Sequence, residues 1–158
     1  MRSVRTLAAV LALISAAWLS GPFPCAAETI ARARGSVVKD TLPYLNVPYL
    51  WGGTHPGTGL DCSGFTQLVF HNAGFGLPRV ARDQFRSTRY LKPEQVLPGD
   101  LIFFAMAHPR TDRVDHVGVY LGKGWFIHAS VSNGVHVEQI SKPYYMDRVV
   151  GIRKFEGF

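Results

Sequence analysis

No apolar run in this 158-residue chain is long enough to cross a lipid bilayer. The longest such stretch, residues 7–19, falls short of the roughly twenty residues that a membrane-spanning helix needs. Two arginines precede it, and the small residues 25–27 follow it. A basic head, a short apolar stretch and a small-x-small site are typical of a secretory signal. We therefore expect residues 1–27 to be a signal peptide cleaved after Ala27, with export and no stable membrane insertion afterwards.

Cysteine is also scarce, because Cys25 and Cys62 are the only two in the chain. Cys25 could be the lipidated residue of a lipoprotein, but Pro24 stands where that signal needs a small residue. Cleavage after Ala27 would remove Cys25 and leave Cys62 without a partner for an internal disulfide. An unpaired thiol in an oxidising compartment indicates a reactive or intermolecular role. Cys62 is therefore a candidate nucleophile.

Internal repeats, low-complexity linkers and a clustered basic face are absent from the sequence. The net charge is +6, but the arginines are spread along the chain. Nucleic-acid binding favours a clustered basic face with aromatic platforms, so we expect no nucleic-acid partner. A mildly basic exported protein would either be attracted to acidic polymers of a cell envelope or have no particular partner. Residues 28–158 suit one domain, which we expect to be a monomer.

The two halves of this domain differ in the spacing of their apolar residues. Helical spacing occurs over residues 29–42 and 63–72, and a shorter helix is expected near 80–88. The glycine-rich stretch 51–60 predicts a loop. Five short runs rich in Val, Ile and aromatic residues follow: 100–104, 115–122, 125–130, 134–140 and 148–155. Helices first and antiparallel strands second predict an α+β fold, with the helices packed on one sheet.

Cys62 lies where the expected loop ends and a helix begins near Ser63. The free N–H groups and the positive dipole end of that helix would stabilise a thiolate and lower the thiol pKa below about 8.5. The alternative is a small buried residue at a helix start that Asp61 or Ser63 caps. The helix start alone does not decide between them.

Among the six histidines, His116 and His128 each interrupt an apolar strand, and a glycine turn joins the two strands. Side chains alternate between the faces of a strand. If Leu121 pairs with Trp125 across a three-residue turn, both histidines lie on one face as diagonal neighbours about 7–8 Å apart at the backbone. A two-residue turn in the same strands would place them on opposite faces. A Cys–His–His set therefore requires the first register.

Two plainer interpretations of these residues stay open. Each histidine could be a core residue that a backbone carbonyl satisfies. Cys62, His116 and His128 could also supply three ligands to zinc, but their spacing is no metal signature. We expect no metal and no cofactor.

Five motifs follow one another in the order typical of the NlpC/P60 family of cell-wall peptidases, which the chain resembles. They are VPYLWGG with GLDCSGFTQLVF, LPRVARDQ, LPGDLIFF, DHVGVYLGKGWFIHAS and YYMDRVVGIRKF. The resemblance runs from about residue 44 to residue 155, nearly all of the expected domain. The resemblance implies a papain-like fold, in which the helix carrying the nucleophile packs on a central antiparallel sheet of about five to six strands.

The resemblance also implies roles for individual residues. It assigns Cys62 as the nucleophile, His116 as the base and His128 as the group that orients the base. The Tyr49 hydroxyl would stabilise the oxyanion together with the Cys62 backbone N–H.

Three more positions match those that family members use around the substrate's free amine and acidic groups: Asp61, Ser63 and Arg79. The implied substrate is the peptidoglycan stem peptide, cut between γ-D-glutamate and the diamino acid. Two alternatives stay open. One is another amidase on the same scaffold, acting on the sugar–peptide amide, and the other is a catalytically silent wall-binding protein.

Overall fold

The computed structural model describes residues 25–158. The expected signal peptide lies almost wholly outside this part of the chain and stays a prediction. Its expected cleavage point after Ala27 falls in the first turn of α1 (Ala26–Thr41). No helix of residues 25–158 is long and apolar enough to cross a membrane.

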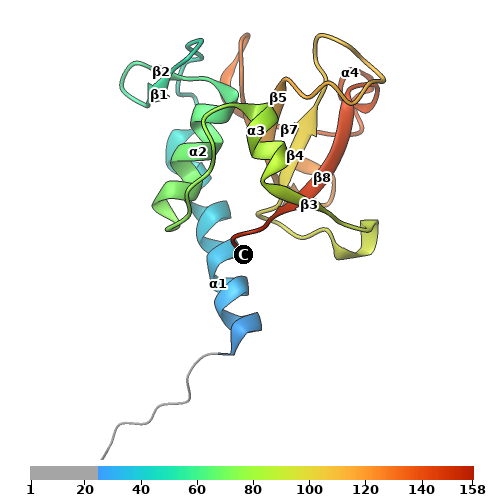
Figure 1. Ribbon diagram of the computed structural model, residues 1–158. Coiled ribbons are helices and arrows are strands. Elements are labelled where there is room, and N and C mark those ends of the chain that lie inside the picture. Colours follow the sequence, from blue (N-terminus) through green and yellow to red (C-terminus); the bar gives the residue numbers. More distant parts are fainter. Residues whose placement is uncertain (1–24) are drawn as a thin grey trace, which may run out of the picture.

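The chain forms a sheet with its longer helices on one side (Figure 1). The sheet has six antiparallel strands in the order β3-β8-β4-β5-β6-β7. Their bounds are Thr88–Tyr90 for β3, Leu101–Phe104 for β4, His116–Gly122 for β5, Trp125–Ser130 for β6, Gly134–Gln139 for β7 and Val149–Phe155 for β8. The expected α+β fold is confirmed, and each of the five expected strands is present.

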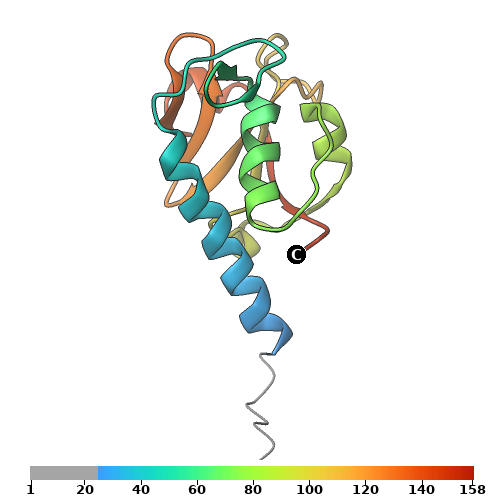
Figure 2. The ribbon, with the colours of Figure 1, turned by 90° about the vertical axis from the view of Figure 1, so that its left-hand side faces the viewer.

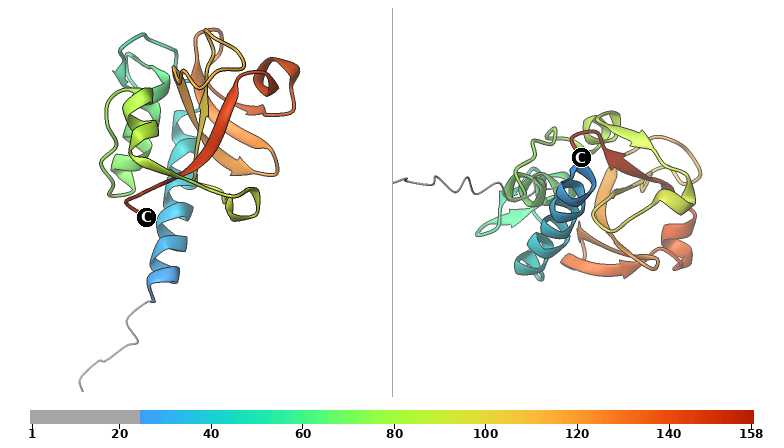
Figure 3. Two further views of the ribbon diagram at one scale, coloured as in Figure 1. Left: turned by 45° about the vertical axis from the view of Figure 1, so that its right-hand side comes forward. Right: turned by 90° about the horizontal axis from the view of Figure 1, so that it is seen from below.

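The helices are α1, α2 (Cys62–Asn72), α3 (Ala81–Arg86) and the short α4 (Pro143–Met146). Figure 2 shows α1 and α2 side by side in front of the sheet, and Figure 3 shows them from below on one side of it. The helix α1 ends at Thr41, and the 3₁₀ turn Leu42–Tyr44, which contains Pro43, follows it directly. A second 3₁₀ turn covers Pro93–Gln95.

Two short features were not expected from the sequence. Inside the glycine-rich stretch, β1 (Thr54–His55) and β2 (Gly59–Leu60) form a two-stranded ribbon. At the edge of the main sheet, β3 pairs with β8. Strands of two or three residues are too short to show the alternation on which sequence prediction relies.

Both faces of the sheet are covered, which explains the apolar runs of its central strands. Toward α1 and α2 lies the larger cluster, which includes Phe65, Val69, Leu101, Phe103, Val117, Val119 and Ile127. The opposite face carries a smaller cluster of Ile102, Phe104, Phe126 and Tyr145, the last from α4. Alternate residues of β4 therefore serve different clusters.

The register of β5 and β6 brings the two predicted histidines to one face. Val119 lies opposite Ile127, which is the register that the Cys–His–His prediction requires. A side chain at Gly118 would collide with the Ile127 carbonyl oxygen and crowd the Cβ of His128. The backbone of β5 thus approaches His128 closely, as only glycine permits.

The turn that joins these strands differs from the expected one. Gly122, and not Leu121, pairs with Trp125, so the turn consists of Lys123 and Gly124. Both turn residues have positive φ, 52° and 79°, as a type I′ turn requires. A register shift just before Gly122 makes Leu121 an extra, bulged residue. The bulge compensates for the shorter turn, so the histidines still share a face.

A buried ion pair ties α1 to the start of β4. Arg34 donates to the Asp100 carboxylate at 2.7 Å, and the two side chains are only 8% and 0% exposed. The second oxygen of Asp100 accepts the Leu97 N–H at 2.8 Å. Burial raises the pKa of Asp100, although Leu97 and Arg34 act in the opposite direction. The pair closes a contact between residues that are 66 positions apart.

Asp100→Asn should lower the free energy of unfolding by about 3–5 kcal/mol, because it leaves the Arg34 charge buried without a counter-ion. Urea denaturation at pH 7 measures the change. The matched control is Asp83→Asn, which removes a largely exposed pair with Arg86 and should cost less than about 1 kcal/mol. Equal losses in both variants would contradict the importance given to the buried pair.

Candidate active site

The first turn of α2 is held by its own cap and by the preceding loop. Asp61 is the N-cap residue, and its carboxylate accepts the Gly64 N–H at 2.6 Å. Its own N–H donates to the Gly53 carbonyl at 3.1 Å. A side chain at Gly64 would collide with that same carbonyl oxygen. This close backbone packing fixes the position of Cys62, the first residue of α2.

Every predicted site residue lines one large cavity. Its volume is about 1000 Å³, and its walls include Tyr49, Asp61, Cys62, Ser63, Arg79, His116 and His128. These residues come from the loop before β1, the start of α2, the segment before α3, and strands β5 and β6. The fold thus brings together residues that are up to 79 positions apart in the sequence.

The two histidines form a short hydrogen-bonded chain. His116 Nε2 lies 2.6 Å from His128 Nδ1, and His128 Nε2 lies 3.3 Å from the Tyr145 hydroxyl. His128 is only 1% exposed. Burial lowers the pKa of His116 to about 4, although Asp115 and Asp61 act in the opposite direction.

His128 is still harder to protonate. Burial, followed by the neighbouring rings of His116 and His136, lowers its pKa to about 2. Both members of the pair are therefore neutral at neutral pH. A neutral His116 can accept a proton, and a neutral His128 can accept the hydrogen bond from His116 Nε2.

The thiol differs from the sequence-based expectation. Cys62 is only 7% exposed, and burial raises its pKa to about 11. Hydrogen bonds from the backbone N–H groups of Val117 and Ser63 lower the pKa, but they do not outweigh burial and the nearby Asp61 charge. The expectation of a pKa below the ordinary value, based on the helix start alone, was therefore wrong for the unliganded site.

The thiol and its expected base line the same cavity but are not hydrogen-bonded to each other. The described residues show no hydrogen bond between Cys62 and the His116 ring, while both line the cavity. Since Nε2 of His116 is engaged with His128, its Nδ1 is the nitrogen left for the thiol. Catalytic hydrogen bonds in unliganded sites are often long and shorten only with substrate bound.

Asp61, Ser63 and Arg79 form one connected polar cluster. Arg79 binds the Asp61 carboxylate with two nitrogens, at 3.0 and 2.6 Å. It also donates to the Ser63 hydroxyl at 3.0 Å, and that hydroxyl donates to Asp61 at 3.2 Å. Burial raises the pKa of Asp61, but the bonds from Arg79 and the Gly64 N–H outweigh this effect and lower it. The cluster presents a fixed arrangement of donors and an anion at one end of the cavity.

Tyr49 lies close enough to the charged groups of this site for them to change the pKa of its hydroxyl. Its backbone forms an isolated parallel bridge with Leu60, just before the nucleophile helix. Burial raises the pKa of its hydroxyl, and the charges of Cys62 and Asp61 raise it further. The hydroxyl therefore stays protonated and can donate a hydrogen bond.

Three residues of the site were missed by sequence reasoning. The fully buried Gln84 accepts from Thr66 at 2.8 Å and donates to the Ser63 carbonyl at 3.0 Å, which links α3 to α2. Asp115, next to His116, accepts two backbone N–H groups, at 2.6 and 2.9 Å. Tyr145 contacts His128 from α4. Gln84 lies in the motif LPRVARDQ and Tyr145 in YYMDRVVGIRKF, so the motifs contained signals that were not used.

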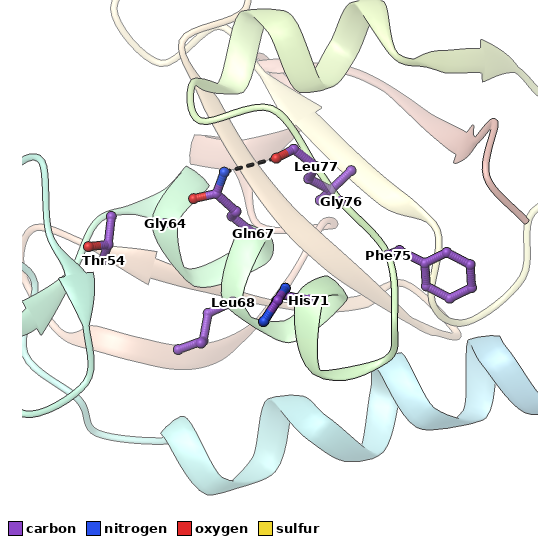
Figure 4. A pocket seen from close by; sticks show the side chains of 8 residues that line it. All are labelled: Thr54, Gly64, Gln67, Leu68, His71, Phe75, Gly76 and Leu77. Atoms are coloured by element: carbon purple, nitrogen blue, oxygen red, sulfur yellow. Dashed lines mark hydrogen bonds between the residues drawn. The ribbon is translucent and has the colours of Figure 1, made fainter.

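A second, smaller cavity lies on the side of α2 that bears Gln67 and His71 (Figure 4). Its volume is about 280 Å³, and none of the predicted site residues lines it. Gln67 spans it by donating to the Leu77 carbonyl at 2.8 Å. Within residues 25–158 there is no group of three or more His, Cys, Asp or Glu side chains that could hold a metal ion.

Comparison with known proteins identifies related chains. Residues 46–154 match the sequence profile of the NlpC/P60 family. Gamma-DL-glutamyl hydrolase of Bacillus subtilis is 38% identical over 128 residues, which cover 80% of this chain and 30% of that protein. The bifunctional muramidase/DL-endopeptidase CwlT of the same organism is 35% identical over 121 residues, or 77% and 36%. This chain therefore spans about a third of the length of these two relatives.

A solved structure supports the same relationship. It is a protein of the NLP/P60 family from Staphylococcus aureus, described as similar to lipoprotein. The TM-score is 0.70 at 36% sequence identity, with 78% of this chain and 41% of the other covered.

The hydrogen-bonded pair of His116 and His128 makes stability depend on pH. Both pKa values are lower in the folded chain than the 6.5 of a free histidine, so only the unfolded state gains protons as the pH falls below about 6.5. The free energy of unfolding should fall between pH 6.5 and 5 by up to about 1.4 kcal/mol per pH unit for each histidine. Urea denaturation at pH 7, 6 and 5 measures this slope.

His116→Gln should reduce that slope by one histidine's share, whatever its effect on stability at pH 7. The control is His71→Gln, at an exposed position near the end of α2, which should keep the wild-type slope. A wild-type slope in His116→Gln would show that His116 titrates normally in the folded chain.

Proposed function

Since the chain belongs to the NlpC/P60 family, we propose that it is an exported cysteine endopeptidase of peptidoglycan that works without a metal or cofactor. One observation carries this proposal. Cys62 at the start of α2 and the hydrogen-bonded pair of His116 and His128 line a single cavity of about 1000 Å³. A nucleophile, a base and an orienting group are the parts that thiol-based amide hydrolysis needs.

The proposed reaction begins with two neutral groups. As Cys62 Sγ attacks the amide carbonyl carbon, its proton passes to Nδ1 of His116. The Cys62 backbone N–H and the Tyr49 hydroxyl donate hydrogen bonds to the oxyanion. His116 then gives the proton to the leaving amine, the C–N bond breaks, and a thioester remains.

Water completes the cycle. His116 takes a proton from water, whose oxygen attacks the thioester carbon. The C–S bond breaks, the carboxylic acid product leaves, and the proton returns to the Cys62 sulfur. His128 holds the His116 ring in place through the 2.6 Å hydrogen bond during both halves.

The proposed scissile bond joins γ-D-glutamate to the diamino acid of the stem peptide. The names of two relatives, a gamma-DL-glutamyl hydrolase and a DL-endopeptidase, support this choice. The polar cluster of Asp61, Ser63 and Arg79 would bind the charged groups that distinguish such a peptide from an ordinary protein chain. The ion pair between Arg79 and Asp61 would have to open before the Asp61 carboxylate could bind an amine of the substrate. We propose that the catalytic domain acts as a monomer.

Digestion of purified peptidoglycan by the full chain, with fragments identified by mass spectrometry, tests the activity and the bond together. Wild type should release fragments ending in γ-D-glutamate, and EDTA should not change the rate. Cys62→Ala should lower the rate by at least about a thousand-fold, because it removes the nucleophile. Cys25→Ala, which removes the other cysteine, should retain the wild-type rate.

The other outcomes separate the alternative functions. Products cut at the sugar–peptide amide would identify a different amidase on this scaffold. Binding to peptidoglycan without any products from wild type would identify a wall-binding protein.

Export is proposed from the arrangement of residues 1–27 in the sequence. Mass spectrometry and N-terminal sequencing of the protein recovered outside the cytoplasm should give Glu28 as the first residue. A chain that begins at Cys25 and carries a lipid mass would instead identify a lipoprotein. A full-length chain that stays in the cytoplasm would refute export.

A further inference from the structure

We propose that Tyr145 is a positioning residue that sets the tautomer of His128 and thereby keeps Nδ1 of His116 free to accept the Cys62 proton. The inference rests on the proposed function, because it concerns the base of that reaction. It starts from the two hydrogen bonds of the buried His128 ring: Nδ1 to His116 at 2.6 Å and Nε2 to the Tyr145 hydroxyl at 3.3 Å.

A neutral histidine carries one ring proton, so each hydrogen bond in the chain determines the next. For His116 Nδ1 to accept the thiol proton, the proton of the neutral ring must be on Nε2. That proton then points at His128 Nδ1, which must be bare. The single proton of His128 is therefore on Nε2, where it needs an acceptor. The Tyr145 oxygen is the acceptor within reach.

The reverse arrangement would disable the base. If His128 carried its proton on Nδ1, it would donate to His116 Nε2. His116 would then hold its own proton on Nδ1, toward the thiol. Its single ring lone pair would be on Nε2, where it accepts the hydrogen bond from His128, so no lone pair would face the thiol to take its proton. The acceptor at His128 Nε2 thus selects the tautomer that can react.

The surroundings leave few alternatives to Tyr145. His128 is 1% exposed, so bulk water cannot replace a missing acceptor. The His136 ring lies 4.7 Å from that of His128 between centroids, tilted by 42°, but its Nδ1 lies 3.1 Å from the Gly134 carbonyl, its own acceptor. Glu138 lies beyond His136 and binds Lys142.

Packing holds the Tyr145 oxygen where it is needed. The residue lies in α4, is 8% exposed, and makes an edge-to-face contact with Phe126 at 5.0 Å between centroids. Phe104 packs on it at 5.7 Å. Since Tyr145 also lines the large cavity, its own proton can point into the cavity while its oxygen accepts from His128. Burial raises the pKa of Tyr145 to about 12, so the hydroxyl stays neutral.

Nitrogen-15 NMR of histidine-labelled wild type tests the tautomers directly and needs no substrate. The resonances of the two rings can be assigned with His116→Gln and His128→Gln. At pH 7, Nε2 of both rings should carry the proton and Nδ1 of both should be bare. A wild-type His128 with its proton on Nδ1 would overturn the proposal, whatever happens to any variant.

Tyr145→Phe tests the consequence for the reaction. It should lower kcat by about ten- to a hundred-fold with little change in KM, and shift the histidines toward the other tautomer. It should slow alkylation of Cys62 by iodoacetamide at pH 7 by a similar factor. The control is Tyr120→Phe, which also removes one hydroxyl hydrogen bond, to the Gly124 N–H, and should match wild type in all three measurements.

The outcomes separate this proposal from the proposed function. If wild type does not cleave peptidoglycan, the proposed function fails, while the tautomers and the alkylation rates still decide the role of Tyr145. An unchanged kcat in Tyr145→Phe, or a lower kcat with unchanged tautomers, would refute that role. A thermal unfolding curve of each variant shows whether the loss follows from unfolding, and if Tyr145→Phe does not fold, the wild-type spectrum alone decides.

Discussion

The alignment of β5 with β6 determines where the groups of the candidate site lie. In a strand, a shift by one residue moves each side chain to the other face. With Val119 opposite Ile127, the valines of β5 pack toward α2, while His116 and His128 share the other face and bond to each other. The bulge at Leu121 maintains this alignment despite the tight Lys123–Gly124 turn.

The site is assembled from buried polar groups that satisfy one another. Asp61 caps α2 and binds Arg79, Gln84 ties the same helix end to α3, and the histidine chain ends on Tyr145. Buried polar groups cost free energy unless they are hydrogen-bonded, so each network favours one arrangement of its side chains. A rigid site of this kind suits a reaction that depends on the position of a proton.

Much of this could be predicted from the sequence where local rules apply. Alternation along strands limited the shared face of His116 and His128 to one register, which the structure has although the turn differs from the expected one. The glycine-rich loop before an apolar helical pattern located the start of α2 near Ser63, one residue after its observed start at Cys62. These properties depend on nearest neighbours along the chain or across one hairpin. Lys123 escaped prediction because a non-glycine residue rarely adopts positive φ.

Other features depend on packing between distant segments, which a local pattern does not contain. The helix start predicted a stabilised thiolate, but the burial of Cys62 raises its pKa. Tyr145 reaches His128 from a helix of only four residues, which shows no periodicity. A neutral, buried thiol also has a chemical consequence. Peroxides attack the thiolate, so an unliganded Cys62 resists oxidation to the sulfenic and sulfinic acids, even without a disulfide partner to protect it.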